Sequence, residues 1–330
     1  MDVHSEVMQP KDLIGELRRF LHDARVVRSA GILLAVSGGR DSMALAKAFT
    51  FLNARSDQPW RIHAAVVDHA LRKGSAREAR FVRDTLLAWG VGCELVTLSP
   101  PKAMPQGALA WARDARYASL EALRRALQLS YVATAHHMDD QAETLILRLV
   151  RGAAPGSLGA MRPRQGALLR PFLGVRRADV DRFVKKHGVP FVDDPTNDDP
   201  SHPRTRVRRE VMPLLQAIGG ADVATRLSAL AADLAEDDAA LAAALPALGR
   251  GATVALAKLS AMPAALQRRA IWTWLQAHAD PRALGRAHVD QCLVLVAGAD
   301  PKAAVKLPGG RVVVREPTRV RVRARQGQKR

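Results

Sequence analysis

Six residues near the start of the chain combine the features of an anion site: Ser37-Gly38-Gly39-Arg40-Asp41-Ser42. They follow the apolar run 32–36 and precede residues 43–49, which have helical spacing, so a strand is expected to turn into a helix through a glycine-rich loop. Adjacent glycines let successive backbone N–H groups face one concavity, and the helix adds the positive end of its dipole. The Ser37 and Ser42 hydroxyls would donate to phosphate oxygens, whereas Asp41 suits a ligand of Mg²⁺. These residues predict a nucleoside triphosphate site with its metal.

The loop differs from the common phosphate-binding sequences. No lysine follows its glycines as G-x-x-x-x-G-K-[ST] requires, and it is not a dinucleotide fingerprint. The pattern SGGxDS after a strand resembles the pyrophosphate-binding loop of the ATP-pyrophosphatase (PP-loop) enzymes. That resemblance implies that the loop holds the β- and γ-phosphates as a leaving group while AMP is transferred. A polar turn without a ligand is the alternative.

A second polar cluster, His136 to Glu143, follows the apolar run 131–135. Asp139 and Glu143 are four positions apart and share one face of an expected helix. Three interpretations are open. The cluster is a metal site with His136, Asp139, Asp140 and Glu143 as ligands, an ordinary acidic helix start, or a set of acids that holds the amino groups of a cationic substrate.

Strands and helices alternate over the first two-thirds of the chain. Strands are expected at 32–36, 62–67, 93–98 and 131–135, with helices at 76–89 and 109–127 between them. Such alternation predicts an α/β fold with a doubly wound, Rossmann-like parallel sheet. Ligands of that fold bind beyond the carboxyl ends of the strands. The glycine loop, Asp68-His69 and the His136 cluster should therefore converge on one crevice.

Length and composition predict two domains and a polyanionic partner. The 330 residues divide into a predicted catalytic domain, 1–215, and a smaller helical or α+β domain, 216–330. In the second part, helices are expected at 221–248, 264–277 and 287–296, strands near 305, 312–314 and 320–322, and the acidic run 236–238 on a solvated face. The 50 Lys+Arg against 32 Asp+Glu give a net charge of +18, which favours nucleic acid.

The remaining composition excludes other classes. The two cysteines, Cys93 and Cys292, form no C-x-x-C pair, which argues against a zinc knuckle, an iron–sulfur cluster or a disulfide scaffold. No apolar stretch is long enough to span a bilayer. We expect a cytoplasmic protein.

Several separated motifs in the same order resemble the tRNA(Ile)-lysidine synthase family. The most distinctive is Thr134 to Thr144, and the resemblance covers about the first 215 residues, with a weaker echo at 307–310. The other motifs are Ser37 to Ser42, Val67 to Arg72, Ala112 to Tyr117, Leu147 to Gly152, Arg170 to Leu173, Asp194 to Asn197 and Arg204 to Arg208.

This resemblance implies an ATP-dependent ligase that adenylates the wobble cytidine of the isoleucine tRNA with a CAU anticodon and replaces AMP by L-lysine. It implies ATP and Mg²⁺ as cofactors, and it allows a homodimer. Asp41, Asp139 and Glu143 would be catalytic, Asp41 also holding the metal. The implied ATP-binding residues are Ser37, Gly38, Gly39, Arg40, Asp41, Ser42, Asp68 and His69; the lysine-binding residues are His136, Asp139, Asp140 and Glu143; the tRNA-binding residues are Arg113, Arg116, Arg151, Arg204 and Arg208.

Two positions depart from the family pattern, and other functions remain as alternatives. Ala70 stands where a glycine is usual and is expected to change little because it is small, and Thr205 stands where an asparagine is usual. A tRNA thiolase of the same superfamily is disfavoured by the missing cysteine pair. An ammonia-using synthetase is disfavoured by the basic charge. A non-catalytic RNA-binding protein would leave the glycine loop and the His136 cluster unexplained.

Overall fold

The computed structural model describes residues 11–70, 74–101, 107–152, 159, 161–193, 199–245, 251–280, 283–298 and 303–324. The chain divides into two compact units. The first consists of Met1–Gln141 with Met161–Thr225, and the second of Ala142–Ala160 with Arg226–Arg330. Helix α5 (Met138–Val150) begins in the first unit and ends in the second. The functional boundary between residues 215 and 216 stays a prediction.

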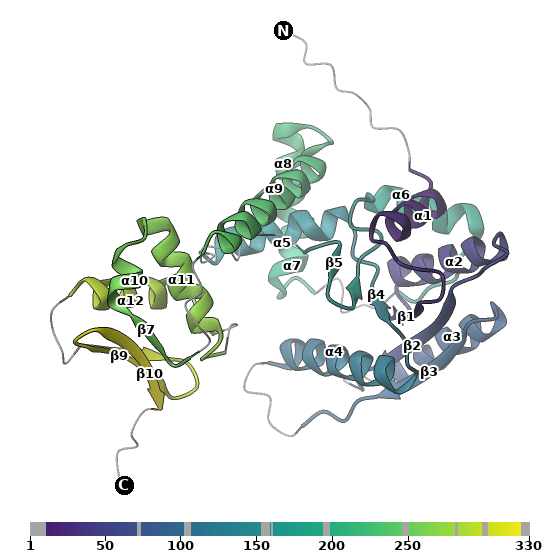
Figure 1. The fold of residues 1–330 in the computed structure, drawn as a ribbon. Helices are drawn as coiled ribbons and strands as arrows, with labels where there is room; N and C mark the ends of the chain where they lie inside the picture. Colours follow the sequence, from purple (N-terminus) through teal and green to yellow (C-terminus); the bar gives the residue numbers. More distant parts are fainter. Residues whose placement is uncertain are drawn as a thin grey trace. The chain divides into compact units, whose positions relative to one another are not determined.

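The first unit contains the predicted doubly wound sheet (Figure 1). Its six strands lie in the order β3-β2-β1-β4-β6-β5, and all neighbours are parallel except β5 and β6. The four strands that the sequence predicts are present, and each of their ends lies within two residues of its predicted position. The strands are β1 (Gly31–Val36), β2 (Arg61–Asp68), β3 (Gly92–Thr97), β4 (Tyr131–Ala133), β5 (Arg164–Gln165) and β6 (Leu168–Leu169).

Helices cover both faces of this sheet because the central strands are apolar on both sides. Ile32 and Leu34 pack in a core with α1, α2, α3 and α6, whereas Leu33 packs with α4 on the opposite face. This alternation follows from the two-residue period of a strand. The helices are α1 (Leu13–Asp23), α2 (Arg40–Ala54), α3 (Ser75–Ala88), α4 (Ala108–Ala126) and α6 (Arg177–His187).

A continuous helical segment follows in the first unit. It consists of α7 (Pro203–Arg206), the π-helix η2 (Val207–Val211) and α8 (Met212–Gly219). π-Helical turns are rare and often accompany functional sites. This segment carries the arginines at 204 and 208 that the family resemblance implies for tRNA.

The second unit combines helices with an antiparallel sheet, as expected. The strand order is β7-β10-β9-β8, and Val313 and Val320 lie in a core with Trp272 and Trp274. The strands are β7 (Thr253–Ala255), β8 (Ala304–Leu307), β9 (Arg311–Glu316) and β10 (Arg319–Ala324). The helices are α9 (Val223–Ala243), α10 (Leu256–Ser260), α11 (Ala264–Gln276) and α12 (Arg286–Ala297).

One expectation for α9 is wrong. Glu236 and Asp237 are exposed, as predicted for the acidic run, but Asp238 pairs with the buried guanidinium of Arg269. Arg269 also donates to the Asp238 carbonyl oxygen (2.8 Å). A buried arginine requires a partner, so Asp238 attaches α9 to α11 within this unit.

Among the described residues, no helix combines the length and the hydrophobicity that a bilayer crossing requires.

Candidate active site

The glycine loop connects β1 to α2 at the point where the strand order reverses. β1 pairs with β2 on one side and β4 on the other, so the turns after β1 and β4 leave the same edge of the sheet in neighbouring positions. This is the topological switch point at which ligands of doubly wound sheets bind. The two predicted clusters are therefore brought together by the topology.

The backbone of the loop is shaped by its glycines. Gly38 has φ +88°, and a Cβ there would lie 2.7 Å from Cγ2 of Val82. Gly39 is the N-cap of α2 and offers no side chain to bond the first-turn amides. These N–H groups lack carbonyl partners within the helix, and together with the helix dipole they form an anion site.

The two serines of the loop have different positions. The Ser42 hydroxyl is buried and donates to the Gly39 carbonyl (2.8 Å), and it accepts from the Ser37 amide (3.1 Å). Ser37 is exposed, with its hydroxyl 3.2 Å from that of Ser42. Ser42 thus fixes the loop shape, while Ser37 is the serine that faces solvent.

Arg40 is held by a neighbouring helix. Its Nη1 donates to Oδ1 of Asp181 on α6 (2.6 Å), and its guanidinium carbon lies 5.0 Å from the ring centre of Phe191. This hydrogen bond to Asp181 raises the pKa of Arg40. Its implied contact with ATP remains a prediction.

Asp41 meets the second cluster through His137, a residue that the sequence analysis did not assign. His137 is 0% exposed, and its Nε2 lies 3.6 Å from Oδ2 of Asp41 and 3.6 Å from Oδ2 of Asp140. The Asp140 amide donates to its Nδ1 (3.3 Å), so Nε2 is the ring nitrogen that faces both carboxylates. Burial alone would lower the pKa of His137, but Asp140, Asp41 and Asp139 outweigh it and raise that pKa.

Asp139 has a structural contact that the sequence did not indicate. Its Oδ2 accepts a hydrogen bond from the backbone amide of Arg177 (2.8 Å), the first residue of α6. A carboxylate at a helix start satisfies an amide that has no partner in the helix. Asp139 therefore caps α6 from a distant segment, in addition to its predicted role with lysine.

Asp140 forms the centre of a buried charge network. Its Oδ1 accepts from Nη2 of Arg204 (2.9 Å) and lies 3.6 Å from Nη2 of Arg208. Burial alone would raise its pKa, but His137 and Arg204 overcome this and hold the pKa at about 2. The guanidinium groups of Arg204 and Arg208 thus face Asp140, and their implied contact with tRNA remains a prediction.

Two further predicted residues lie on α5 and directly after it. Glu143 is 2% exposed and lies one helical turn after Asp139. Arg151 is exposed just after the end of α5. Both belong to the second unit, and their assignments to lysine and tRNA remain predictions.

His136 is a neutral imidazole at the sheet edge. Its Nδ1 lies 2.9 Å from Oγ1 of Thr134. Burial lowers its pKa to about 4, with Arg170 and Arg116 adding to the effect against the opposing charge of Asp140. An uncharged ring does not repel a nearby ammonium group, which suits the predicted lysine site.

Asp68 and His69 end β2 beside the glycine loop. Asp68 is buried, and its Oδ1 accepts from the amide of Ala70 (2.9 Å). Ala70 has φ +53°, in the left-handed region that glycine adopts freely, so alanine is strained at this position, and the expectation that it changes little stays a prediction. Burial, with Arg116 adding, lowers the pKa of His69.

The remaining implied tRNA residues of the first unit lie on α4. The guanidinium carbons of Arg113 and Arg116 lie 5.5 Å and 5.3 Å from the ring centre of Tyr117. Arg113 is exposed and Arg116 is half-buried. Motif positions 71–72 and 194–197 lie outside the described residues.

The site fits Mg²⁺ through a single aspartate. In the described part of the chain, no group of three or more His, Cys, Asp or Glu side chains is arranged around a metal position. Asp41 nevertheless has a buried Oδ1 without a hydrogen-bond partner. Mg²⁺ is commonly held by one or two carboxylates with substrate phosphates and waters completing its shell, so Asp41 is a sufficient protein ligand.

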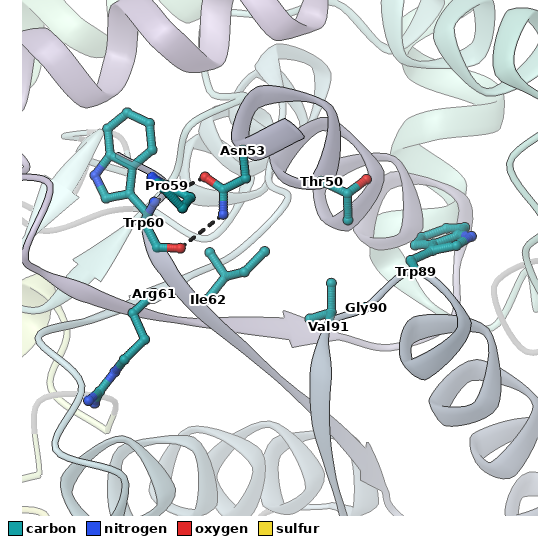
Figure 2. Close-up of a pocket in the computed structure, with 9 residues that line it drawn as sticks. All are labelled: Thr50, Asn53, Pro59, Trp60, Arg61, Ile62, Trp89, Gly90 and Val91. Carbon is teal, nitrogen blue, oxygen red and sulfur yellow. Dashed lines mark hydrogen bonds between the residues drawn. The ribbon is translucent and has the colours of Figure 1, made fainter. Parts of the chain in front are cut away.

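A shallow pocket elsewhere in the first unit lacks these features (Figure 2). It has a volume of about 340 Å³ and lies at the amino ends of β2 and β3, near Trp60, Arg61 and Trp89. Asn53 bonds the Trp60 backbone there, accepting from its amide (3.1 Å) and donating to its carbonyl (2.9 Å). Its one titratable lining residue, Arg61, donates to the carbonyls of Leu127 and Gln128. The pocket therefore offers no catalytic group.

Comparisons with protein families match both parts of the chain. A family described as PP-loop domain matches residues 11–215, and one described as TilS substrate binding domain matches residues 255–327.

Curated relatives match most of the length. A tRNA(Ile)-lysidine synthase of Leifsonia xyli is 40% identical, over 86% of this chain and 86% of the relative. The tRNA(Ile)-lysidine synthase of Thermobifida fusca is 38% identical, over 89% of this chain and 91% of the relative. The tRNA(Ile)-lysidine synthase of Mycobacterium tuberculosis is 38% identical, over 84% of this chain and 83% of the relative.

A solved structure supports the fold alone. The U34-tRNA thiolase NcsA of Methanococcus maripaludis aligns with a TM-score of 0.57 at 14% identity, covering 68% of this chain and 78% of the thiolase.

Proposed function

Because the chain belongs to the tRNA(Ile)-lysidine synthase family, we propose that it converts the wobble cytidine of the CAU anticodon of isoleucine tRNA into lysidine. ATP and L-lysine are the co-substrates, and the cytoplasm is the compartment. The observation that carries the proposal is the meeting of the glycine loop and the Asp139–Asp140 turn at the switch point of the sheet, through Asp41 and His137. A homodimer stays a prediction.

The first step is adenylation. The cytidine O2 attacks the α-phosphorus of ATP, a bond from O2 to phosphorus forms, and pyrophosphate leaves. The amides of Gly38 and Gly39 and the exposed Ser37 hydroxyl suit the leaving pyrophosphate. Mg²⁺ on Asp41 would neutralise charge on its oxygens when bound. Phosphoryl chemistry of this kind asks the protein mostly for alignment and charge neutralisation.

The second step is displacement by lysine. The ε-amine attacks C2 of the activated cytidine, and AMP leaves with the former O2. A lysine ammonium has a pKa near ~10.4, so a proton must leave it before attack. The carboxylates of Asp139 and Glu143 suit capture of the ammonium and removal of that proton, while neutral His136 adds no repulsion.

Cationic groups in both units suit the tRNA. On the outer face of the second sheet, β10 carries Arg319, Arg321 and Arg323, with Glu316 paired to the first two. Arg113 and Arg151 are exposed in the first and second units. These charges and the net +18 favour contact with phosphates.

The cysteines disfavour thiolase chemistry. Cys93 lies on β3 in the first unit and Cys292 is buried in the second. Burial raises the pKa of Cys93 to about 11 and that of Cys292 to about 12, so neither is a reactive thiolate. No pair is available to carry sulfur.

The test is an incubation of the full chain with tRNA, ATP and Mg²⁺, and separately with lysine, a sulfide donor or ammonium. Mass spectrometry of the wobble nucleoside should find the mass of lysidine only with lysine, together with AMP and pyrophosphate in equal amounts. A thiolated or aminated nucleoside would replace the proposal. tRNA binding without any nucleotide turnover would identify a non-catalytic RNA-binding protein.

A further inference from the structure

Three arginines gather beside the candidate active site. Arg113 and Arg116 lie on α4, and Arg170 directly follows β6. β6 pairs with β4 so that Ala133 lies opposite Leu169, and the Thr134 amide donates to the Leu169 carbonyl (3.0 Å). This register brings Arg170 to the carboxyl edge of the sheet, next to the turn that carries His136.

Two polar atoms of this group are buried without an acceptor. Arg170 is 5% exposed, and its Nη1 donates to the Arg162 carbonyl (2.7 Å), but its Nε has no hydrogen-bond partner. The Tyr117 hydroxyl, on the ring flanked by Arg113 and Arg116, is also buried, and its proton has no acceptor because the groups that bond to it, Arg116 and Arg170, are donors only. Buried polar groups are nearly always bonded, so these two atoms indicate a missing acceptor.

The group also lacks a counter-charge. No carboxylate among the described residues forms an ion pair with Arg113, Arg116 or Arg170. Burial lowers the pKa of Arg116 and of Arg170, and the charge of Arg113 lowers both further. Like charges held together under desolvation are unfavourable, and an anion among them would remove that cost.

We propose that Arg113, Arg116, Arg170 and the Tyr117 hydroxyl form a binding site for one phosphate ester of the substrates. Guanidinium forks match phosphate oxygens, and the tyrosine adds a neutral donor. The inference rests on the proposed function for the identity of the substrates. Two of their phosphates have this chemistry: the one that ATP transfers as AMP, and the backbone phosphate of the target cytidine.

The experiment measures the Kd of AMP, pyrophosphate and tRNA for the full chain by calorimetry and filter binding. The sharpest variant is Tyr117→Phe, because it removes one hydroxyl and keeps the ring beside the guanidinium groups of Arg113 and Arg116. It should weaken one of the two phosphate esters about 3- to 10-fold, the scale of one hydrogen bond. Arg113→Gln, at an exposed position, should weaken the same ligand about 10-fold or more.

Further variants separate binding from folding. Because Arg170 is buried, Arg170→Met is used only if its circular dichroism spectrum matches that of the wild type. Arg170→Lys keeps the positive charge and should restore part of the affinity that Arg170→Met loses. Arg19→Gln, at a guanidinium that is 65% exposed on α1, is the control and should bind all three ligands normally.

The ligand that responds identifies the phosphate. Weaker AMP binding with unchanged pyrophosphate binding assigns the site to the transferred phosphate. Weaker tRNA binding, with a salt slope reduced by about one and unchanged AMP binding, assigns it to the tRNA backbone. Wild-type affinity of Tyr117→Phe and Arg113→Gln for all three ligands would overturn the proposal. These assays need no lysidine formation, so they stand whether or not the proposed reaction occurs.

Discussion

The two turns at the switch point are built differently. In the turn from β1 to α2, the side chains that shape the backbone bond to the loop itself, from Ser42 to Gly39 and from Ser37 to Ser42. Its distant contacts come from Val192, whose amide donates to the Gly38 carbonyl (2.9 Å), and from Asp181, which pairs with Arg40. In the turn from β4 to α5, the carboxylates bond to distant segments, Asp139 to α6 and Asp140 to Arg204, in addition to the local bonds between Asp140 and His137. The first turn leaves amides and a carboxylate oxygen for a ligand. In the second turn, the carboxylates of Asp139 and Asp140 already bond to groups of the protein.

This difference predicts which substitutions affect chemistry and which affect folding. Asp41 has an oxygen without a partner, whereas both oxygens of Asp140 have partners. Polar groups already satisfied by the protein contribute to stability, and those left unsatisfied are available to substrates. The substitutions below test this division of roles.

The largest effect is expected for Asp140→Ala. The substitution leaves Arg204 and the buried His137 without this carboxylate. Removing one partner of a buried pair lowers the free energy of unfolding by about 3–5 kcal/mol. Urea unfolding of the wild type and the variant measures the difference. A variant as stable as the wild type would remove the distinction between the two turns.

The pH dependence supplies an independent check of the same residue. Its folded pKa of about 2 lies below the unfolded value of ~3.9, so ionised Asp140 stabilises the folded chain above about pH 4. This contribution is lost as the pH falls from about 4 to about 2. The stability difference between wild type and Asp140→Ala should therefore shrink over that range, and a difference independent of pH would contradict the charge network.

Asp41→Ala should affect turnover and not folding. Loss of a key electrostatic partner costs at least ~10²-fold in rate. Its effect on unfolding should be small because Oδ1 has no partner and Oδ2 lies 3.6 Å from His137. Release of AMP and pyrophosphate gives the rate, and urea unfolding gives the stability. The exposed Asp84→Ala is the control, and AMP release at the wild-type rate from Asp41→Ala would sink the assignment.

The same contrast explains what the sequence could predict. The glycine loop was predictable because its serine bonds join residues within six positions of one another, and strand and helix periodicity placed it correctly. The partners of the second turn lie far along the chain, Arg177 after 38 positions and Arg204 after 64. No local pattern connects them. The role of His137, between acids from two different turns, could not be predicted for the same reason.

Two other features of the structure were not visible in the sequence, one because of a distant contact and one because of backbone conformation. Asp238 looked solvated within its acidic run, but its partner Arg269 lies on another helix of the second unit. Ala70 looked harmless because its small size is visible in the sequence, whereas its positive φ is not. The helices and strands themselves were predictable in both units because hydrophobic periodicity is a local property.

Asp139 separates capping from substrate binding within the second turn. Asp139→Asn keeps an oxygen for the Arg177 amide but removes the charge, so stability should change little while KM for lysine rises about tenfold. Asp139→Ala removes both, and it should also lose about 1 kcal/mol of stability, the scale of a helix cap. Steady-state kinetics and urea unfolding of the two variants give the comparison. An unchanged KM for lysine in Asp139→Asn would leave Asp139 with the structural role alone.

The smallest effect concerns two backbone positions with positive φ at neighbouring strand ends. Ala70→Gly should raise the free energy of unfolding by up to about 1 kcal/mol, because glycine avoids the left-handed strain of ~1–2 kcal/mol but loses more chain entropy. Gly38→Ala should act in the opposite direction and more strongly, because its Cβ would meet Val82 at 2.7 Å as well as adopt φ +88°. Urea unfolding measures both, and the rate of AMP release should fall only for Gly38→Ala, whose carbon would disturb the anion loop. If Ala70→Gly instead lowers stability, the strain at that position is smaller than the entropy that alanine saves, and the second strand end tolerates alanine for that reason.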